Sequence, residues 1–175
     1  QAIALLGDIG RENDFKLDKI FGSHKDPARG NNLGMVSWQG TRRKNLEKFL
    51  SKRGLLNADG TIQRSEEAMK AQVEFAKLEM ENNKRWKKGF LDNKDISIEK
   101  ARDELGGAGS YFGWAKGQTT IRKADGTRVS FDSGAQESKA NAYSKTAEIV
   151  VKEENKNTIS GRTPINNQAE KIVNS

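Results

Sequence analysis

Apolar residues recur along most of this chain at the spacing of a helix face. Over residues 2–14, Leu5 and Ile9 lie four positions apart, and Glu12 follows three positions later on the same face. The same periodicity predicts further helices over residues 41–53, 65–88, 97–105 and 134–153. The first helix therefore carries an apolar stripe that leads directly to a carboxylate near its C-terminal end.

The helix predicted over residues 65–88 is the longest. It should begin at Ser65, because two glutamates then occupy its first turn, where negative charge is favourable beside the positive end of the helix dipole. Its predicted buried face consists of Met69, Val73, Ala76 and Met80, extended by Phe75 and Trp86.

Three segments lack this helical periodicity. Residues 15–40 are rich in Gly, Asn and Asp, which predicts a loop. Residues 119–131 contain two short runs with β-branched residues on either side of the turn Asp125-Gly126, which predicts a β-hairpin. From Glu154 onward the chain is polar and rich in Asn, which predicts a tail or an extended strap on another surface.

These elements predict a mainly α fold followed by a small β-hairpin and a C-terminal helix with a tail. A chain of 175 residues suits one domain with a small appendage. We expect a helical domain over residues 1–116. Residues 117–175, with the hairpin, the helix and the polar tail, are expected to act as a connector or a partner-binding segment.

Composition excludes several kinds of chemistry. Only 34% of the residues are hydrophobic, and no run of 18 apolar residues occurs, so we expect a modest core and no membrane span. The absence of cysteine excludes a disulfide scaffold and a thiolate nucleophile. A single histidine, His24, excludes a multi-histidine metal site. Carboxylate chemistry, or no chemistry at all, remains, and neither a metal nor an organic cofactor is implied.

The positive charge of the chain is clustered. The 31 Lys and Arg residues outnumber the 24 Asp and Glu residues, for a formal net charge of +7. Basic residues concentrate at 42–53 and 84–88, within predicted helices. This distribution indicates an anionic partner such as nucleic acid, an acidic polymer or a cell envelope, although solvated helix faces account for it equally well.

Glu12 is the candidate for carboxylate chemistry. A carboxylate near a helix C-terminus faces the negative end of the dipole, and apolar neighbours such as Ile9 and Phe15 would shield it from water. Both effects favour its protonated form. A carboxylic acid that stays protonated near neutral pH is what cleavage of a glycosidic bond requires. A solvated glutamate at a helix end is the alternative interpretation.

Two short motifs resemble the phage tail lysozyme family. The residues Gly-Asp-Ile-Gly-Arg-Glu-Asn-Asp-Phe at 7–15 resemble its pattern G-N-x-x-x-E-S-x-F. The residues Leu-Gly-Met-Val-Ser-Trp-Gln-Gly-Thr-Arg-Arg at 33–43 resemble its following pattern G-(I/L)-A-Q-W-T-G-x-R-R. With the order of the helices that follow, the resemblance covers residues 2–114. It implies a lysozyme-like helical domain akin to goose-type lysozymes and lytic transglycosylases.

The resemblance also implies a set of site residues. Glu12 would be the general acid and base. The substrate-binding residues would be Gly34, Ser37, Trp38, Gln39 and Tyr111. The sequence departs from the family pattern at Asn13, where Ser is usual, and at Ser37, where a substrate-holding Gln is usual. Gln39 or Ser37 itself would have to replace that Gln.

The activity implied by the resemblance is cleavage of the β-1,4 bond between N-acetylmuramic acid and N-acetylglucosamine in peptidoglycan glycan strands. Hydrolysis and formation of a 1,6-anhydro product both remain open. The host protein would be a phage virion component, in the tail or ejected from the particle, that acts in the bacterial cell wall or periplasm. Other virion proteins, or the rest of a longer chain, would be its further partners.

Several residues near these motifs have two interpretations. Asp8 lies one turn before Glu12 on the same face, and we interpret it as structural. Relatives without a second catalytic carboxylate use the N-acetyl group of the substrate as the internal nucleophile. His24 is expected to be a solvated loop residue. Tyr111 and Trp114 would either lie near the acid or pack in the core, and the same choice applies to Trp38.

Two other functions are compatible with the sequence. The first is a non-enzymatic basic helical module that packs in a virion or binds nucleic acid. No base-reading motif, RNA-binding aromatic pattern or zinc spacing occurs, so nucleic acid is not the expected partner. The second is a lysozyme-like fold without activity, for which the departure at Ser37 is the main argument.

Overall fold

A computed structural model describes residues 1–26, 30–107, 109–114, 116–122 and 126–159. Within these residues the fold is mainly helical, with two small antiparallel hairpins and a long C-terminal helix. The predicted mainly α fold class is therefore confirmed. No helix in the described ranges combines the length and the apolar character needed to cross a membrane.

The helices and strands have the following bounds. The α-helices are α1 (Ala2–Asn13), α2 (Leu17–Ile20), α3 (Gly40–Ser51), α4 (Glu66–Glu81), α5 (Lys84–Trp86), α6 (Ile98–Gly106) and α7 (Ser133–Ile159), and a π-helical turn covers Lys87–Leu91. The first hairpin is β1 (Ser23–Asp26) with β2 (Gly30–Leu33), and the second is β3 (Thr120–Arg122) with β4 (Arg128–Ser130).

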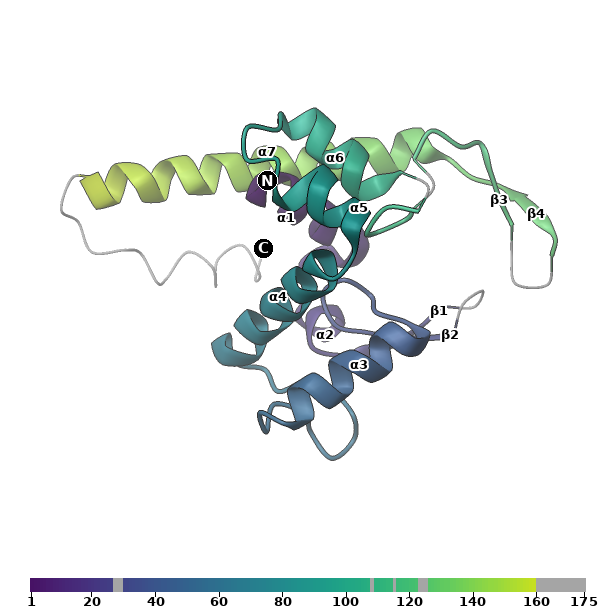
Figure 1. Ribbon diagram of the computed structural model, residues 1–175, viewed down its shortest axis with the longest axis vertical. Helices are drawn as coiled ribbons and strands as arrows, with labels where there is room; N and C mark the ends of the chain where they lie inside the picture. The colour runs from purple at the N-terminus through teal and green to yellow at the C-terminus, as the bar shows by residue number, and fades with distance from the viewer. Residues whose placement is uncertain (27–29, 108, 115, 123–125, 160–175) are drawn as a thin grey trace.

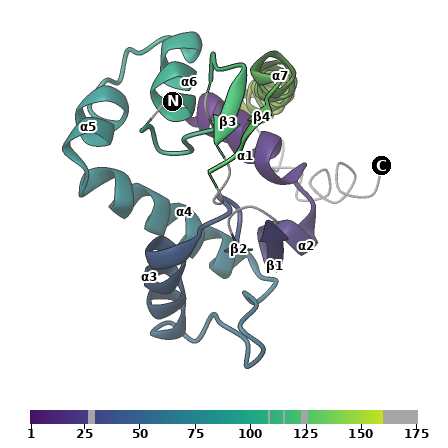
Figure 2. The same ribbon diagram turned by 90° about the vertical axis from the view of Figure 1, so that its right-hand side faces the viewer.

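Helix α4 connects two groups of elements (Figure 1). The hairpin β1–β2 and the helices α2 and α3 lie toward one end of α4, whereas α1, α5, α6 and α7 lie toward the other, as the second view also shows (Figure 2). The helices predicted over residues 2–14, 41–53, 97–105 and 134–153 and the hairpin at 119–131 are all present, with small shifts at their ends.

The segment 15–40 differs from the loop that its composition predicts. It contains the short helix α2 and the hairpin β1–β2, whose register pairs Ser23 with Leu33 and His24 with Asn32. The glycines and asparagines there serve as turn and strand residues, and two four-residue strands are too short to produce a visible alternation of apolar and polar positions.

The helix predicted to run from Ser65 to Lys88 ends earlier. Ser65 is its N-cap and accepts a hydrogen bond from the backbone N–H of Ala68, but α4 stops at Glu81. The side chain of Asn83 then caps a new helical turn by accepting hydrogen bonds from the backbone N–H groups of Arg85 and Trp86. An asparagine at this position competes with the continuous helix and starts a new one.

The buried face of α4 is also rotated from the predicted one. Met69 and Val73 are 38% and 45% exposed, so the prediction that both are buried is wrong, whereas Ala76 and Met80 are buried as predicted. The remaining buried residues of α4 are Ala68, Ala71, Gln72 and Phe75. Gln72 turns inward because its Oε1 accepts a hydrogen bond from the backbone N–H of Met35, 2.9 Å away.

Helix α7 packs along α1, and both views show the two helices side by side (Figures 1 and 2). Ala140, Ser144 and Ala147 are buried in this contact, and the ring of Tyr143 meets that of Phe15 edge-on with centroids 5.3 Å apart. Residues 154–159, predicted to be tail, continue α7, and the tail after Ile159 lies outside the described residues. The division at residue 116 stays a prediction.

Replacing Gly7 tests the close approach of α1 and α7. A Cβ atom on Gly7 would lie 2.8 Å from the backbone oxygen of Ala140, which is too close. Alanine normally stabilises a helix by about 1 kcal/mol relative to glycine. We expect Gly7→Ala instead to lower the free energy of unfolding by about 1 to 3 kcal/mol, as overpacking does.

Chemical denaturation measures this change, and Gly134→Ala is its control. A Cβ on Gly134, in the first turn of α7, would meet only a movable side-chain atom, Oδ1 of Asp132, at 3.3 Å. The control should leave stability unchanged or raise it. Stabilisation by Gly7→Ala would contradict the α1–α7 packing.

Candidate active site

Asn13 links the C-terminal end of α1 to the loop that follows β2. Its side chain is fully buried, and its Nδ2 donates a hydrogen bond to the backbone oxygen of Met35, 2.7 Å away. Its Oδ1 accepts one from the backbone N–H of Phe15 at 2.8 Å. The bond to Met35 brings the two motifs of the sequence together.

The loop after β2 is a tight turn. Leu33 and Trp38 exchange two backbone hydrogen bonds, of 3.0 and 2.9 Å, across residues 34–37. Gly34 and Ser37 both have positive φ, of 74° and 54°. A Cβ on Gly34 would lie 2.5 Å from Oε1 of Gln72, so the turn requires glycine there. Packing of the turn therefore accounts for Gly34, and its contact with substrate stays a prediction.

Glu12 lies at the C-terminal turn of α1, next to Asn13. Its side chain is 22% exposed, and its Oε1 contacts Nη2 of Arg11 in an ion pair. Most of the side chain is therefore shielded by the protein, with part of it open to solvent. A carboxyl group in such a position is accessible to a substrate without being fully hydrated.

Arg11 is held by a second carboxylate, that of Asp8. Asp8 is fully buried, and its Oδ1 accepts hydrogen bonds from Nε of Arg11 at 3.3 Å and from the indole Nε1 of Trp114 at 2.9 Å. Burial raises the pKa of Asp8 above its usual value, although the Arg11 guanidinium opposes that rise. A side chain without solvent access cannot touch a substrate, and this agrees with the structural interpretation of Asp8.

Trp38 and Tyr111 are core residues, which is one of the two interpretations that the sequence leaves open for them. They are only 1% and 2% exposed. The indole Nε1 of Trp38 and the hydroxyl of Tyr111 each donate a hydrogen bond of 2.7 Å to Oε2 of Glu79 on α4. Arg42 completes the cluster by donating to both Glu79 oxygens, at 2.9 and 2.8 Å.

The hydrogen bonds to Glu79 attach the loop to α4. Burial and the Glu79 carboxylate raise the pKa of Tyr111 well above its usual value, so its hydroxyl stays protonated as a donor. Arg42 also stacks on the Tyr111 ring, with 4.6 Å between its guanidinium carbon and the ring centroid. Trp38 and Tyr111 therefore bind Glu79 on α4, and Trp38 attaches the loop to that helix.

Ser37 and Gln39 keep some access to solvent, since both are half-buried. The Oγ of Ser37 lies 3.4 Å from Nε2 of His24, and Nδ2 of Asn32 lies 3.3 Å from the same nitrogen. His24 is thus a half-buried strand residue in contact with the loop, and the prediction of a solvated loop histidine is wrong. Gln39 directly precedes α3.

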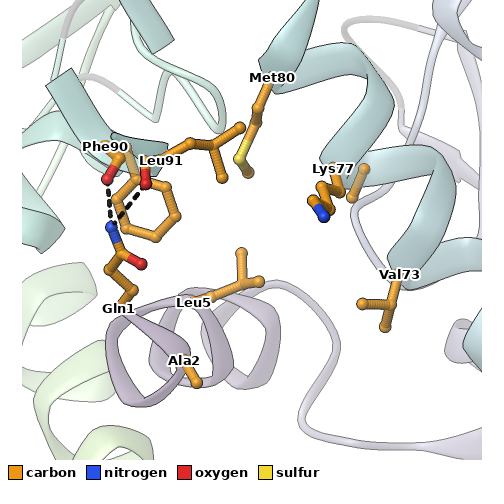
Figure 3. A pocket seen from close by; sticks show the side chains of 9 residues that line it. Gln1, Ala2, Leu5, Val73, Lys77, Met80, Phe90 and Leu91 are labelled. Carbon is orange, nitrogen blue, oxygen red and sulfur yellow. Dashed lines mark hydrogen bonds between the residues drawn. The ribbon is translucent and has the colours of Figure 1, made fainter. Parts of the chain in front are cut away.

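Two pockets of the structure lie away from Glu12. An apolar pocket of about 180 Å³ lies between the start of α1, α4 and the π-helical turn, with Leu5, Val73 and Met80 facing it (Figure 3). A pocket of about 470 Å³ runs along α3, α4 and α5 beside Arg42 and Trp86. Glu12 lines neither of them, so neither adds to the site.

Three arginines of the basic segment 42–53 form ion pairs with glutamates. The pairs are Arg42–Glu79, Arg43–Glu47 and Arg53–Glu74. The lysines of this segment, Lys44, Lys48 and Lys52, are exposed. The charge available to an anionic partner on this segment is therefore smaller than the sequence alone indicates. Among the described residues no group of three or more His, Asp or Glu side chains could hold a metal ion.

In comparisons with known proteins, no protein family, no curated protein and no solved structure matches this chain. The function of the site therefore has to be inferred from its residues and their geometry.

The site predicted from the sequence lacked Arg11 and its contacts with Asp8, Trp114 and Gln136. The i, i+3 spacing of Asp8 and Arg11 is a helical ion-pair signal that could have indicated their contact. Trp114 lies about a hundred residues further along the chain, and Gln136, which accepts from Nη1 of Arg11 at 3.3 Å, lies further still. No local sequence pattern predicts such distant contacts.

Asp14, just after Glu12, supplies a pH-dependent test of this end of α1. Its carboxylate contacts Nζ of Lys139 at 2.5 Å and the hydroxyl of Tyr143 at 3.1 Å, both on α7. Burial alone would raise the pKa of Asp14, but the Lys139 ammonium and the Tyr143 hydroxyl outweigh it and lower that pKa. A lowered native pKa contributes stability above the unfolded-state pKa, and this stability is lost as the pH falls through the native value.

We expect Asp14→Asn to lower the free energy of unfolding near neutral pH by about 1 kcal/mol, as loss of a charge-assisted hydrogen bond does. The difference from wild type should shrink as the pH falls through the native pKa of Asp14 and vanish below it, where Asp14 is protonated in both states. Urea denaturation across this pH range measures it. Asp18→Asn, at an 84% exposed side chain, is the matched control and should have little effect. A deficit that persists at low pH would contradict the assigned ion pair.

Proposed function

We propose that this chain is a peptidoglycan glycosidase in which Glu12 is the general acid and base. The observation that carries the proposal is the hydrogen bond of 2.7 Å from Asn13 Nδ2 to the backbone oxygen of Met35. It places the helix end with Glu12 against the loop at residues 34–40, and these are the two motifs that resemble the phage tail lysozyme family. Two motifs that are separate in the sequence form one structural unit, as a shared site requires.

The proposed reaction begins with protonated Glu12. Its carboxyl group donates the proton to the glycosidic oxygen between N-acetylmuramic acid and N-acetylglucosamine, and the bond from the anomeric carbon to that oxygen breaks with the electron pair going to the oxygen. The resulting carboxylate then accepts a proton from the group that attacks the anomeric carbon. Attack by water gives a reducing end, and attack by the muramyl 6-hydroxyl gives a 1,6-anhydro product.

The second catalytic group in this proposal belongs to the substrate. Asp8 is fully buried and hydrogen-bonded to Arg11 and Trp114, so it does not reach an anomeric carbon. The substrate N-acetyl group, acting as an internal nucleophile, takes the place of a second carboxylate. No metal ion or organic cofactor has a role in this scheme.

Substrate contacts are assigned to the surface of the loop. The half-buried residues Ser37 and Gln39 are proposed to bind the glycan strand, with Gly34 shaping the turn beneath it. The exposed lysines after the loop would attract the anionic cell wall, an effect that weakens as salt increases. The proposed setting is a phage particle that opens the wall locally during cell entry.

Incubation with purified sacculi tests the proposal directly. We expect the wild type to release soluble muropeptides and Glu12→Gln to release them at least about 100-fold more slowly, because general acid catalysis contributes that much or more. Mass spectrometry of the products separates reducing ends from anhydro ends. The matched control is Glu67→Gln, the same change at an exposed glutamate on α4.

The control should behave as the wild type does. Equal release by wild type and Glu12→Gln would place the catalytic group elsewhere. Failure of the folded wild type to release muropeptides would contradict the proposed enzyme, and salt-sensitive DNA binding in its place would favour the basic helical module.

A further inference from the structure

The guanidinium of Arg11 uses all three of its nitrogens. Nε donates to Asp8 Oδ1 at 3.3 Å, Nη1 donates to Oε1 of Gln136 on α7 at 3.3 Å, and Nη2 contacts Glu12 Oε1. The residue is buried, with only 7% of its surface exposed. A planar fork with a different partner at each nitrogen has one favourable orientation. Arg11 is thus fixed from two helices at once.

Trp114 supports the same guanidinium from its face. The guanidinium carbon of Arg11 lies 4.9 Å from the centroid of the Trp114 ring. The indole Nε1 also donates to Asp8 Oδ1, so the aromatic ring and the buried carboxylate hold one another as well as the arginine. Asp8, Trp114 and Gln136 therefore form a rigid setting for Arg11, and Arg11 presents its remaining nitrogen to Glu12.

We propose that Arg11 is the positioning residue of the acid, and that it binds Glu12 Oε1 so that Oε2 is the oxygen that carries and transfers the proton. This inference rests on the proposed function. A free carboxyl group on a helix end rotates, and either oxygen can carry the proton. With Oε1 bound to Nη2, the transferable proton is held on Oε2. Such a fixed orientation of a catalytic group lowers the entropic cost of reaching the transition state.

The charge of Arg11 also affects the reaction. When Oε2 releases its proton to the glycosidic oxygen, Glu12 becomes negatively charged, and a guanidinium in contact with it stabilises that charge. Arg11 therefore makes proton transfer from Oε2 faster.

The other cations near this cluster contact groups other than Glu12. From α6, Nη2 of Arg102 donates to the backbone oxygen of Glu137 at 3.1 Å. Lys116 forms an ion pair with the Glu137 side chain at 3.0 Å, and Lys139 pairs with Asp14. Among the described residues, Arg11 is the cation in direct contact with Glu12.

The test compares Arg11→Met with Arg11→Lys. On solubilised glycan strands we expect Arg11→Met to lower kcat by about 100-fold with little change in KM, because the acid is misplaced and substrate binding is not. Arg11→Lys keeps the charge and should restore most of the wild-type kcat.

The matched control is Arg64→Met, at an exposed arginine whose side chain pairs with Asp18. It should leave kcat and KM unchanged. A folded Arg11→Met protein with an unchanged kcat overturns the inference. So does a kcat for Arg11→Lys as low as that of Arg11→Met, because a packing role alone would produce it.

A double-mutant cycle tests the contact between Arg11 and Glu12 without any activity measurement. Thermal unfolding compares the wild type with Arg11→Met, with Glu12→Gln and with the double variant. We expect the change in Tm of the double variant to differ from the sum of the single changes, and additive changes overturn the contact. If the wild type releases no muropeptides, the proposed function fails and Arg11 has no catalytic role, whereas the cycle still reports on the ion pair.

Discussion

The C-terminal turn of α1 is the constraint on which the rest of the site depends. Arg11, Asn13 and Asp14 lie within four residues of one another, and their side chains reach separate parts of the fold. Arg11 reaches Trp114 and α7, Asn13 reaches the loop after β2, and Asp14 reaches α7. Glu12 lies between these anchored neighbours, so its backbone position is determined by three sets of contacts from distant segments of the chain.

Two carboxylates, the buried Asp8 and the half-buried Glu79, organise the aromatic residues in the same way. Asp8 accepts hydrogen bonds from a tryptophan indole and an arginine, and Glu79 accepts them from a tryptophan indole, an arginine and a tyrosine. In each cluster the guanidinium also lies over an aromatic ring. A buried charge is stabilising only when it is paired and hydrogen-bonded. The cluster of Asp8 fixes the arginine beside Glu12, and the cluster of Glu79 fixes the loop after β2.

The sequence predicted the elements that have a long apolar repeat, and it failed where single polar contacts decide the structure. Helix α1 and the long α7 follow from their periodicity, and so does the second hairpin from its turn. The buried face of α4 was misassigned because Gln72 turns inward to bind the Met35 backbone. That contact joins residues 37 positions apart, and no local pattern of hydrophobicity reports it.

The candidate site was predictable only in part. Glu12 and the loop at 34–40 were found from two short motifs, and the structure brings them together. Trp38 and Tyr111 were assigned to the substrate from the family resemblance, and their sequence context suits either a groove or a core. The partner that decides between these is Glu79, which the sequence does not single out. Arg11 went unnoticed for the same reason, since two of its partners lie beyond residue 110.

The central claim is that a glycan strand binds where the end of α1 meets the loop after β2. The most direct measurement is a titration of the ¹⁵N-labelled Glu12→Gln protein with soluble peptidoglycan strands, followed by amide chemical shifts. The account predicts that the perturbed amides cluster at residues 12–14 and 34–40. Perturbations confined to the lysine-bearing surfaces of α3 and α5, or none at all at saturating strand concentration, would contradict it.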